Sequence, residues 1–333
     1  MSSKVYEKMA ARQLLIAVLV LVALLVAVFL FALAVGAVRV PIGSLVSGDS
    51  VASRIFWELR FPRVCLAGLV GATLALSGVT FQTMLRNPLA DPFVLGISGG
   101  AGAAAATATS LGWAQIPGLL PLTSFAGALA ATIFVILVSR RAGRLDSSRL
   151  ILSGLVMNAF CSAIILLAVS LSKASDMALA VRWMMGGFFT GSWRDVAILG
   201  ASTATAWLTM VVIAGDVRML EFGADDARAR GVDPDRVSTI AVVAAALATG
   251  VAVSVSGIIG FIGLLVPHAI RSIWRSDYRS LIHLCALGGA ILLIAADAVS
   301  RVVIAPSELP VGVLTAFLGV PFFVTLLRRS SNE

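Results

Sequence analysis

The sequence predicts an all-α protein that crosses a membrane about ten times. Of its 333 residues, 59% are hydrophobic and only 13% are charged, and the mean hydropathy is +1.01. The hydrophobic residues gather in ten runs that are long enough, or nearly long enough, to span a bilayer. No Pro/Gly/Ser-rich linker separates these runs. We therefore expect residues 1–333 to form a single transmembrane domain.

The ten runs follow one another along the chain. They cover residues 13–36, 62–84, 93–112, 118–139, 150–171, 196–214, 238–256, 258–273, 281–304 and 310–327. The first run is about as long as a full span and has no clear cleavage site, so we expect it to stay as the first helix. The eighth follows the seventh almost without a break, and the turn between them is expected near Ser256 and Gly257.

Basic residues divide unequally between the two sides of the predicted bundle. With the N-terminus inside, 17 of the 25 lysines and arginines lie on the inner side. This excess predicts that both termini lie in the cytoplasm. The net charge of +8 is then accounted for by membrane topology, and no nucleic-acid partner is expected.

One long polar interruption, residues 215–236, lies between the sixth and seventh runs. Residues 219–230 are expected to be helical, with acidic residues near the start and arginines near the end. Gly231 is then a C-cap, and Asp233 with Pro234 opens a second short helix. The segment is either a solvated loop or a docking element for a soluble partner, and by the orientation above it faces the cytoplasm.

Several kinds of chemistry have no support in the sequence. No GxxxxGK[ST] motif occurs, and the only lysines are Lys4, Lys8 and Lys173, so the chain alone is not expected to hydrolyse ATP. His268 and His283 have no Cys or carboxylate cluster beside them, and the three cysteines stand singly. We expect no catalytic residue, no metal and no cofactor, which disfavours a membrane enzyme.

An ion-coupled secondary carrier is a further alternative. Such carriers hold ionisable residues deep in their helices. Here Asp297 is the nearest exception, and it lies four residues before Arg301 on the same helix face, where a local ion pair is expected. The driving energy is therefore expected to come from outside this chain.

Arg60 and Arg63 flank Pro62 at the start of the second run. Proline suits a first helical turn, but two cations there oppose both the helix dipole and the positive-inside bias. We expect them to be exposed on the outer side. There they contact either lipid headgroups or carboxylates of an outside partner.

Seven stretches resemble one family, the FecCD/BtuC-type permeases of ABC importers for iron-siderophores, haem and vitamin B12. They are LRFPR (59–63), SGVTFQTMLRNPLADPFVLGISGGAG (77–102), RWMMGGF (182–188), FGADDARARGVDPDR (222–236), GIIGFIGLLVPHAIR (257–271), ADAVSR (296–301) and PSELPVGVLTAFLGVPFF (306–323). They span nearly the whole chain in the order of the family.

This resemblance implies a type II ABC importer permease fold in the cytoplasmic (inner) membrane. It implies a homodimer of ten-helix subunits in membrane lipid, with two copies of an ABC ATPase subunit below and an extracytoplasmic substrate-binding protein above. The implied coupling helices cover about 215–237. Their matching residues are Glu221, Gly223, Asp226, Ala227, Gly231 and Arg236.

The resemblance also implies three further sets of residues. The arginines that pair with glutamates of the binding protein map to Arg60, Arg63 and Arg301. The cytoplasmic gate maps to Asn87, Leu89, Ser147 and Ser148. The translocation path runs near Met157, Asn158, Leu314 and Phe317. An iron complex is the favoured substrate because of the breadth of the family, and cobalamin is the alternative because RWMMGGF resembles the vitamin B12 permease.

Overall fold

The computed structural model describes residues 3–36, 51–141, 144–188, 191–221, 223–274, 277–304 and 307–330. Within these ranges the chain is helical apart from short connections and one two-stranded hairpin. The longer helices are α1 Ser3–Ala34, α3 Phe61–Met84, α4 Ile97–Ser110, α5 Leu119–Ser139, α6 Ser147–Leu171, α7 Ala174–Met184, α8 Trp193–Glu221, α10 Pro234–Ser256, α11 Ile262–Ile273, α12 Tyr278–Ser300 and α13 Val311–Ser330. The short elements are α2 Val51–Arg54, η2 Ile55–Arg60, η3 Pro92–Leu95, η4 Trp113–Gln115, α9 Ala224–Ala229, and the antiparallel strands β1 Arg140–Arg141 and β2 Arg144–Leu145.

Seven of the described helices are long and apolar enough to cross a membrane, where about ten were predicted. They are α1, α3 together with η2, α5, α6, α8, α10 and α12. The other three predicted spans fall on α4, α11 and α13, of which α4 and α11 are shorter than their apolar runs. The reason is visible at α4 and α11, because the short helix η3 uses the first part of the α4 run and irregular backbone uses the first part of the α11 run.

The break before α11 lies where the sequence predicted a turn. α10 ends at Ser256, and Gly257 has a φ of +67°, which glycine adopts without steric cost. The helix resumes only at Ile262, after Phe261, which holds the left-handed conformation with a φ of +70°. The predicted turn is therefore confirmed, but the predicted start of the eighth span at 258 is wrong.

The helix α3 forms the centre of the larger group of helices. It packs on α8, α10, α11 and α12, and it is the most buried of the seven spanning helices. Close approach depends on glycine: a Cβ on Gly71 would collide with the carbonyl oxygen of Gly289 in α12, and one on Gly78 with that of Gly263 in α11. These contacts confirm the tight packing that small residues allow in membrane bundles.

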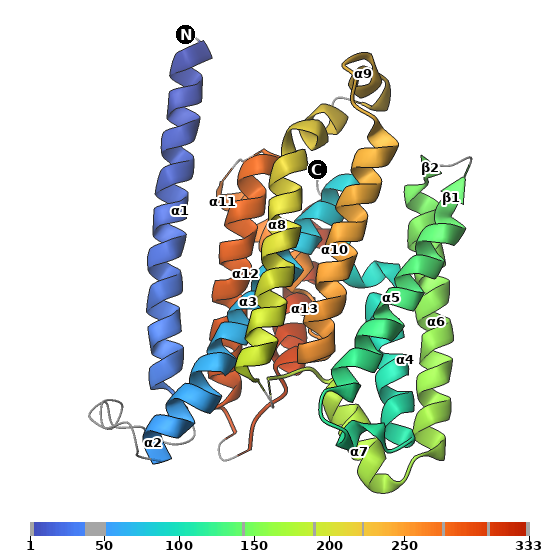
Figure 1. Cartoon of the computed structure of the whole chain (residues 1–333). Coiled ribbons are helices and arrows are strands. Elements are labelled where there is room, and N and C mark those ends of the chain that lie inside the picture. The colour runs from blue at the N-terminus through green and yellow to red at the C-terminus, as the bar shows by residue number, and fades with distance from the viewer. Residues whose placement is uncertain are drawn as a thin grey trace.

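A second group consists of α4, α5, α6 and α7, on the right in Figure 1. The helix α10 contacts α4 and α5 on one side and α3 and α8 on the other. It therefore joins the two groups. The first helix, α1, stands at the opposite edge and packs on α12 (Figure 1).

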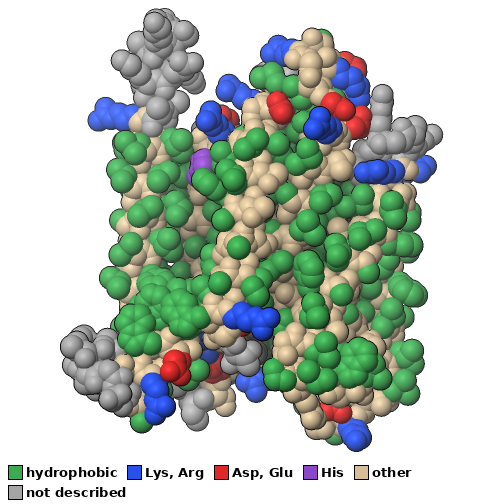
Figure 2. Space-filling view, in the orientation of Figure 1, with side chains coloured by type: hydrophobic (Ala, Val, Ile, Leu, Met, Phe, Trp, Pro, Cys, Tyr) green, Lys and Arg blue, Asp and Glu red, His purple; other side chains and the backbone are tan. Residues whose placement is uncertain are grey.

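The two ends of the bundle differ. One end, here the α9 end, carries α9, the β1–β2 hairpin and both chain termini, and the other, the α7 end, carries α2 and α7 (Figure 1). Charged side chains gather toward these two ends, and hydrophobic side chains cover the band between them (Figure 2). This distribution fits a protein whose middle lies in lipid.

Candidate functional site

Arg63 lies in a cluster of charged side chains at the α7 end. Its Nε and Nη2 donate to Oδ1 of Asp297 at 3.0 and 2.9 Å, and its Nη1 donates to both carboxylate oxygens of Glu308 at 3.0 and 2.9 Å. The second oxygen of Asp297 lies 3.2 Å from Nε of Arg301. The Asp297 side chain is 1% exposed, whereas that of Glu308 is 28% exposed. The cluster thus joins α3, α12 and the segment that leads into α13.

The other two arginines of this cluster bind the C-terminal end of α1. Nη2 of Arg301 donates to the carbonyl of Ala32 at 3.0 Å and its Nη1 to that of Val35 at 3.1 Å, while Nη1 of Arg60 donates to that of Leu33 at 3.0 Å. The last carbonyls of a helix have no partner within the helix, and they carry the negative end of its dipole. The guanidinium groups of Arg60 and Arg301 supply hydrogen-bond donors to these carbonyls and positive charge to this end of the dipole.

The expectation that Arg60 and Arg63 stand exposed on the surface is wrong. Arg60 is 7% exposed and Arg301 is 4% exposed, and the Arg63 side chain is 15% exposed. Cations occur at this end because buried carboxylates and helix-terminal carbonyls bind them. The expected local ion pair of Asp297 and Arg301 is confirmed. Docking of an outside partner on the three arginines stays a prediction.

The polar segment at the α9 end forms the expected helix-turn-helix, with two differences. The predicted helix over 219–230 is two helices, because α8 runs on to Glu221 and α9 starts after Gly223, whose φ is +125°. Gly231 has a φ of +81°, as the predicted C-cap requires. Asp233 and Pro234 open the long helix α10 and not a second short one, with Asp233 accepting from the backbone of its first turn.

The six predicted coupling residues lie on or beside α9. Among their described side chains, Asp226 and Arg236 are exposed, and Ala227 is fully buried. Arg228 holds the two limbs of the turn together, with Nη1 3.1 Å from Asp225 and Nη2 3.5 Å from Asp235. The buried alanine anchors α9 while its charged face is left open to a partner.

The expected gate residues lie at two places. Asn87 and Leu89 are in the turn that follows α3, and Ser147 and Ser148 are in the first turn of α6. Asn87 Oδ1 accepts from the backbone nitrogen of Leu89 at 2.9 Å, a local turn that leaves Leu89 38% exposed. Ser147 and Ser148 begin α6, where Asp146 caps the helix. These positions form ordered turns, and their role as a gate stays a prediction.

The loop after Asn87 carries an acid in an unusual environment. Asp91 accepts from the backbone nitrogen of Phe93 at 2.9 Å and so caps η3. Burial raises the pKa of Asp91 to about 6, although the backbone hydrogen bond acts in the opposite direction. The same loop contacts α6, because Asn158 Nδ2 donates to the carbonyl of Phe93 at 3.1 Å.

Two larger apolar cavities lie beside the helices of the predicted path. One, of about 560 Å³, is formed by α7, the break before α11 and α13, and Phe261 and Phe317 line it. The other, of about 500 Å³, lies between α4, α5 and α6, and Met157 lines it. Leu314 packs against the core, and Asn158 bonds to the loop. The four predicted path residues are therefore not brought together within one chain.

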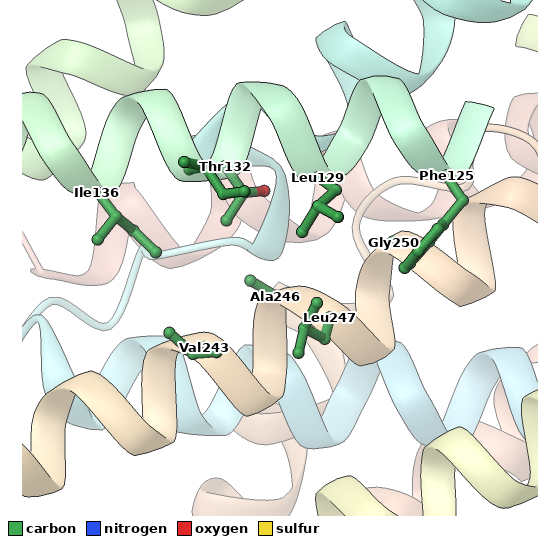
Figure 3. A pocket seen from close by; sticks show the side chains of 9 residues that line it. Phe125, Leu129, Thr132, Ile136, Val243, Ala246, Leu247 and Gly250 are labelled. Atoms are coloured by element: carbon green, nitrogen blue, oxygen red, sulfur yellow. The ribbon is translucent and has the colours of Figure 1, made fainter. Parts of the chain in front are cut away.

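A third, smaller cavity of about 60 Å³ lies between α5 and α10. The labelled side chains of both helices point into it, and nearly all of them are apolar (Figure 3). Thr132 is its polar member, and its hydroxyl donates to the carbonyl of Ala128 in its own helix. This cavity is a packing gap in the bundle and offers no groups for chemistry.

The described residues include no group of three or more His, Cys, Asp and Glu side chains that could hold a metal. The two histidines make aromatic contacts instead. His283 accepts from Nε1 of Trp207 at 3.1 Å, and the rings of His268 and Phe322 pack edge to face at 5.5 Å. Both contacts join neighbouring helices.

Sequence reasoning missed two features of this site. Glu308 lies in the stretch PSELP, yet its pairing with Arg63 could not be foreseen across 245 residues. Gln82, near the end of α3, donates to the carbonyl of Gly263 at 3.1 Å and accepts a short hydrogen bond from Arg271. The available signal for Gln82 was that it is the one amide side chain in the second apolar run, 62–84.

Known proteins resemble this chain over most of its length. The model of the FecCD transport family matches residues 24–329. The vitamin B12 import system permease protein BtuC of Salmonella arizonae is 40% identical over 290 residues, which is 86% of this chain and 87% of that protein. The protein of the same name from Salmonella typhimurium is 39% identical over 298 residues, covering 86% and 88%.

Solved structures resemble the fold as well. A chain described as an inward-facing conformation of a putative metal-chelate type ABC transporter matches with a TM-score of 0.83 at 26% identity, covering 94% of this chain and 98% of that one. PsaBC from Streptococcus pneumoniae, in complex with Fab, matches with a TM-score of 0.56 at 16% identity, over 82% and 92%. The second likeness concerns the fold alone.

Proposed function

The chain belongs to the FecCD transport family, and from this premise we propose that it carries vitamin B12 through the inner membrane. It is a multi-pass permease component of an ABC importer. The observation that supports the substrate is the 40% identity, over 86% of the chain, to a vitamin B12 import permease. This reverses the order expected from the sequence, where an iron complex came first.

An iron complex or another metal chelate remains the second candidate. Two observations favour it: membership of the FecCD transport family, and the likeness, at a TM-score of 0.83, to a transporter of the metal-chelate type. The broad apolar cavity beside α13 discriminates poorly between bulky ligands. Selectivity is therefore assigned to a separate substrate-binding protein.

In this proposal the permease works with an ATPase subunit at the α9 end, and that end lies in the cytoplasm together with both termini. The exposed charges of Asp226, Arg228 and Arg236 suit a soluble partner. A displacement of α9 reaches both groups of helices, because α10 follows it and contacts α3 and α5. Two packed states of the bundle, biased by ATP in the partner, then alternate access.

A second copy of the chain completes the translocation path. The helix α6 presents a strongly apolar face, with Phe160, Leu167 and Leu171 at 62%, 60% and 76% exposure. Phe317 on α13 is 72% exposed beside the larger cavity. A two-fold pair that brings these faces together would enclose the cavity and gather the path residues that one chain keeps apart.

Co-purification from native membranes tests the proposed function. The tagged chain is extracted in mild detergent, the bound proteins are identified by mass spectrometry, and the captured binding protein is screened with cobalamin, ferric siderophores and haem. Capture of an ATPase and tight cobalamin binding support the proposal. Tight binding of a ferric siderophore or haem alone moves the substrate to the second candidate. Transport by the chain alone, driven by an ion gradient, would restore the secondary carrier.

A further inference from the structure

We propose that Glu308 is an exchangeable counter-ion of Arg63, which an acidic docking partner replaces. This inference rests on the proposed function, which includes a separate substrate-binding protein, and on the predicted docking of that protein on the arginines at the α7 end. It adds that docking there breaks an ion pair inside the chain, and that this break releases the start of α13.

The two carboxylates on Arg63 differ in how firmly they are held. Asp297 lies within α12, is 1% exposed, and also contacts Arg301. Glu308 is 28% exposed and belongs to a short connection before α13. A carboxylate from outside can therefore reach the Glu308 side of the guanidinium, and it cannot reach the Asp297 side without opening the bundle.

The charge of the cluster favours this exchange. Among the residues that the structure describes, the three arginines Arg60, Arg63 and Arg301 lie with two carboxylates, Asp297 and Glu308, so these five side chains carry an excess of one positive charge. Such an excess attracts an acidic surface at longer range. On contact, the partner's carboxylate replaces an ion pair of equal chemistry, so the exchange has a low net cost.

The consequence lies in what Glu308 holds in place. It is followed by Leu309, whose backbone nitrogen donates to the carbonyl of Ser300 at 3.1 Å, and by Pro310, which leads into α13. In the first turn of α13, a Cβ on Gly312 would collide with the carbonyl of Met185, so this turn is seated on the segment after α7. Loss of the Glu308 pair removes one of the ties at this junction.

The helix that is released lines the larger cavity. Val313, Phe317 and Val320 of α13 form one side of it, and Phe261 of the break before α11 forms another. The Phe261 ring fills the space beside Gly319, where no Cβ could be placed. A shift of α13 at its start would therefore change the width of the cavity, which links docking at the α7 end to the path.

The test uses the full complex in lipid nanodiscs with the binding protein captured above. Glu308→Gln keeps the size of the side chain and removes its charge, and Glu58→Gln is the matched control, because Glu58 is an exposed acid of η2 at the same end. Glu308→Gln is expected to tighten docking by about two- to fivefold, the range of a partly exposed ion pair, while Glu58→Gln does not. Unchanged or weaker docking in Glu308→Gln would overturn the exchange.

A second readout does not depend on affinity. A spin label on a cysteine at the exposed Ser307 reports the mobility of the connection. Addition of the binding protein to the otherwise unchanged complex should raise this mobility, and Glu308→Gln should raise it without the binding protein. A label that stays immobile in both cases excludes the release of α13. If the wild-type complex captures no binding protein, docking itself fails, whereas normal capture with an immobile label refutes the exchange alone.

Discussion

Asp297 and Arg63 are joined by two hydrogen bonds, from Nε and Nη2 of the arginine to one carboxylate oxygen, although 234 residues separate them in the chain. The other oxygen of Asp297 faces Arg301. One buried carboxylate thus balances two guanidinium groups. Loss of its charge would leave uncompensated positive charge in the interior.

Asp297→Asn is therefore expected to destabilise the protein strongly. Removing one partner of a buried ion pair costs about 3–5 kcal/mol, because the remaining charge stays desolvated. The measurement is the thermal unfolding midpoint of the purified chain in detergent, with Glu58→Gln as the control for loss of one negative charge. Equal midpoints for the two variants would show that Asp297 is dispensable.

Gly71→Ala should disturb the contact of α3 with α12. The added methyl group would collide with the backbone carbonyl of Gly289, and overpacking of this kind costs about 1–3 kcal/mol. Gly215→Ala is the matched control, because Gly215 is also helical but has open space where the methyl would go. A lower unfolding midpoint is expected for the first variant only; a fall of the same size in both would point to a general effect of alanine.

Substitutions at Gly231 test backbone strain without steric crowding. Its φ of +81° suits glycine and asparagine, yet a Cβ at this position would have no neighbour within 4 Å. In the complex, Gly231→Asn should keep ATP hydrolysis coupled to transport, whereas Gly231→Val should distort the turn after α9 and lower the transport per ATP. The ratio is measured in proteoliposomes. Equal coupling in the two variants would remove the turn conformation from the mechanism.

Asp91 should make stability depend on pH. Because burial raises its pKa from 3.8 to about 6 in the folded state, the folded chain binds the proton more tightly than the unfolded chain does. The stabilisation present below pH 3.8 is therefore lost as the pH rises to about 6. Asp91→Asn keeps an oxygen that can accept from Phe93, so it should flatten this dependence and raise the midpoint at pH 7.

The Asp91 series is followed by thermal unfolding between pH 4 and pH 8. Asp91→Ala supplies the control, because it removes the cap of η3 together with the charge and should lose the gain at pH 7. A wild-type curve that is flat between pH 4 and pH 6 would contradict the assigned environment of Asp91.

Local chemistry explains which parts of the fold were predictable. The turn at Gly231, the start of α10 at Asp233 and Pro234, and the end of α10 before Gly257 depend on neighbouring residues, and all three are where the sequence places them. The lengths of α4 and α11 were overestimated because an apolar run does not reveal where, within it, the long helix begins.

The arginine cluster shows which part of the site could not be predicted from the sequence. The sequence indicated that Arg60 and Arg63 oppose the helix dipole and the positive-inside bias, so that other groups must bind them. It also indicated the pair of Asp297 with Arg301. It could not indicate that Glu308 completes the cluster, since no periodic pattern relates residues on separate helices. The exposure expected for these arginines was wrong for the same reason.

The bonds from Arg301 to the end of α1 also fix an order of events during biosynthesis. Arg301 is added 269 residues after Ala32, whose carbonyl it binds. The helix α1 therefore leaves the ribosome and enters the membrane long before the side chain that holds its end exists. Its attachment must wait until α12 has been inserted, so a ribosome that stops before residue 301 leaves α1 without this anchor.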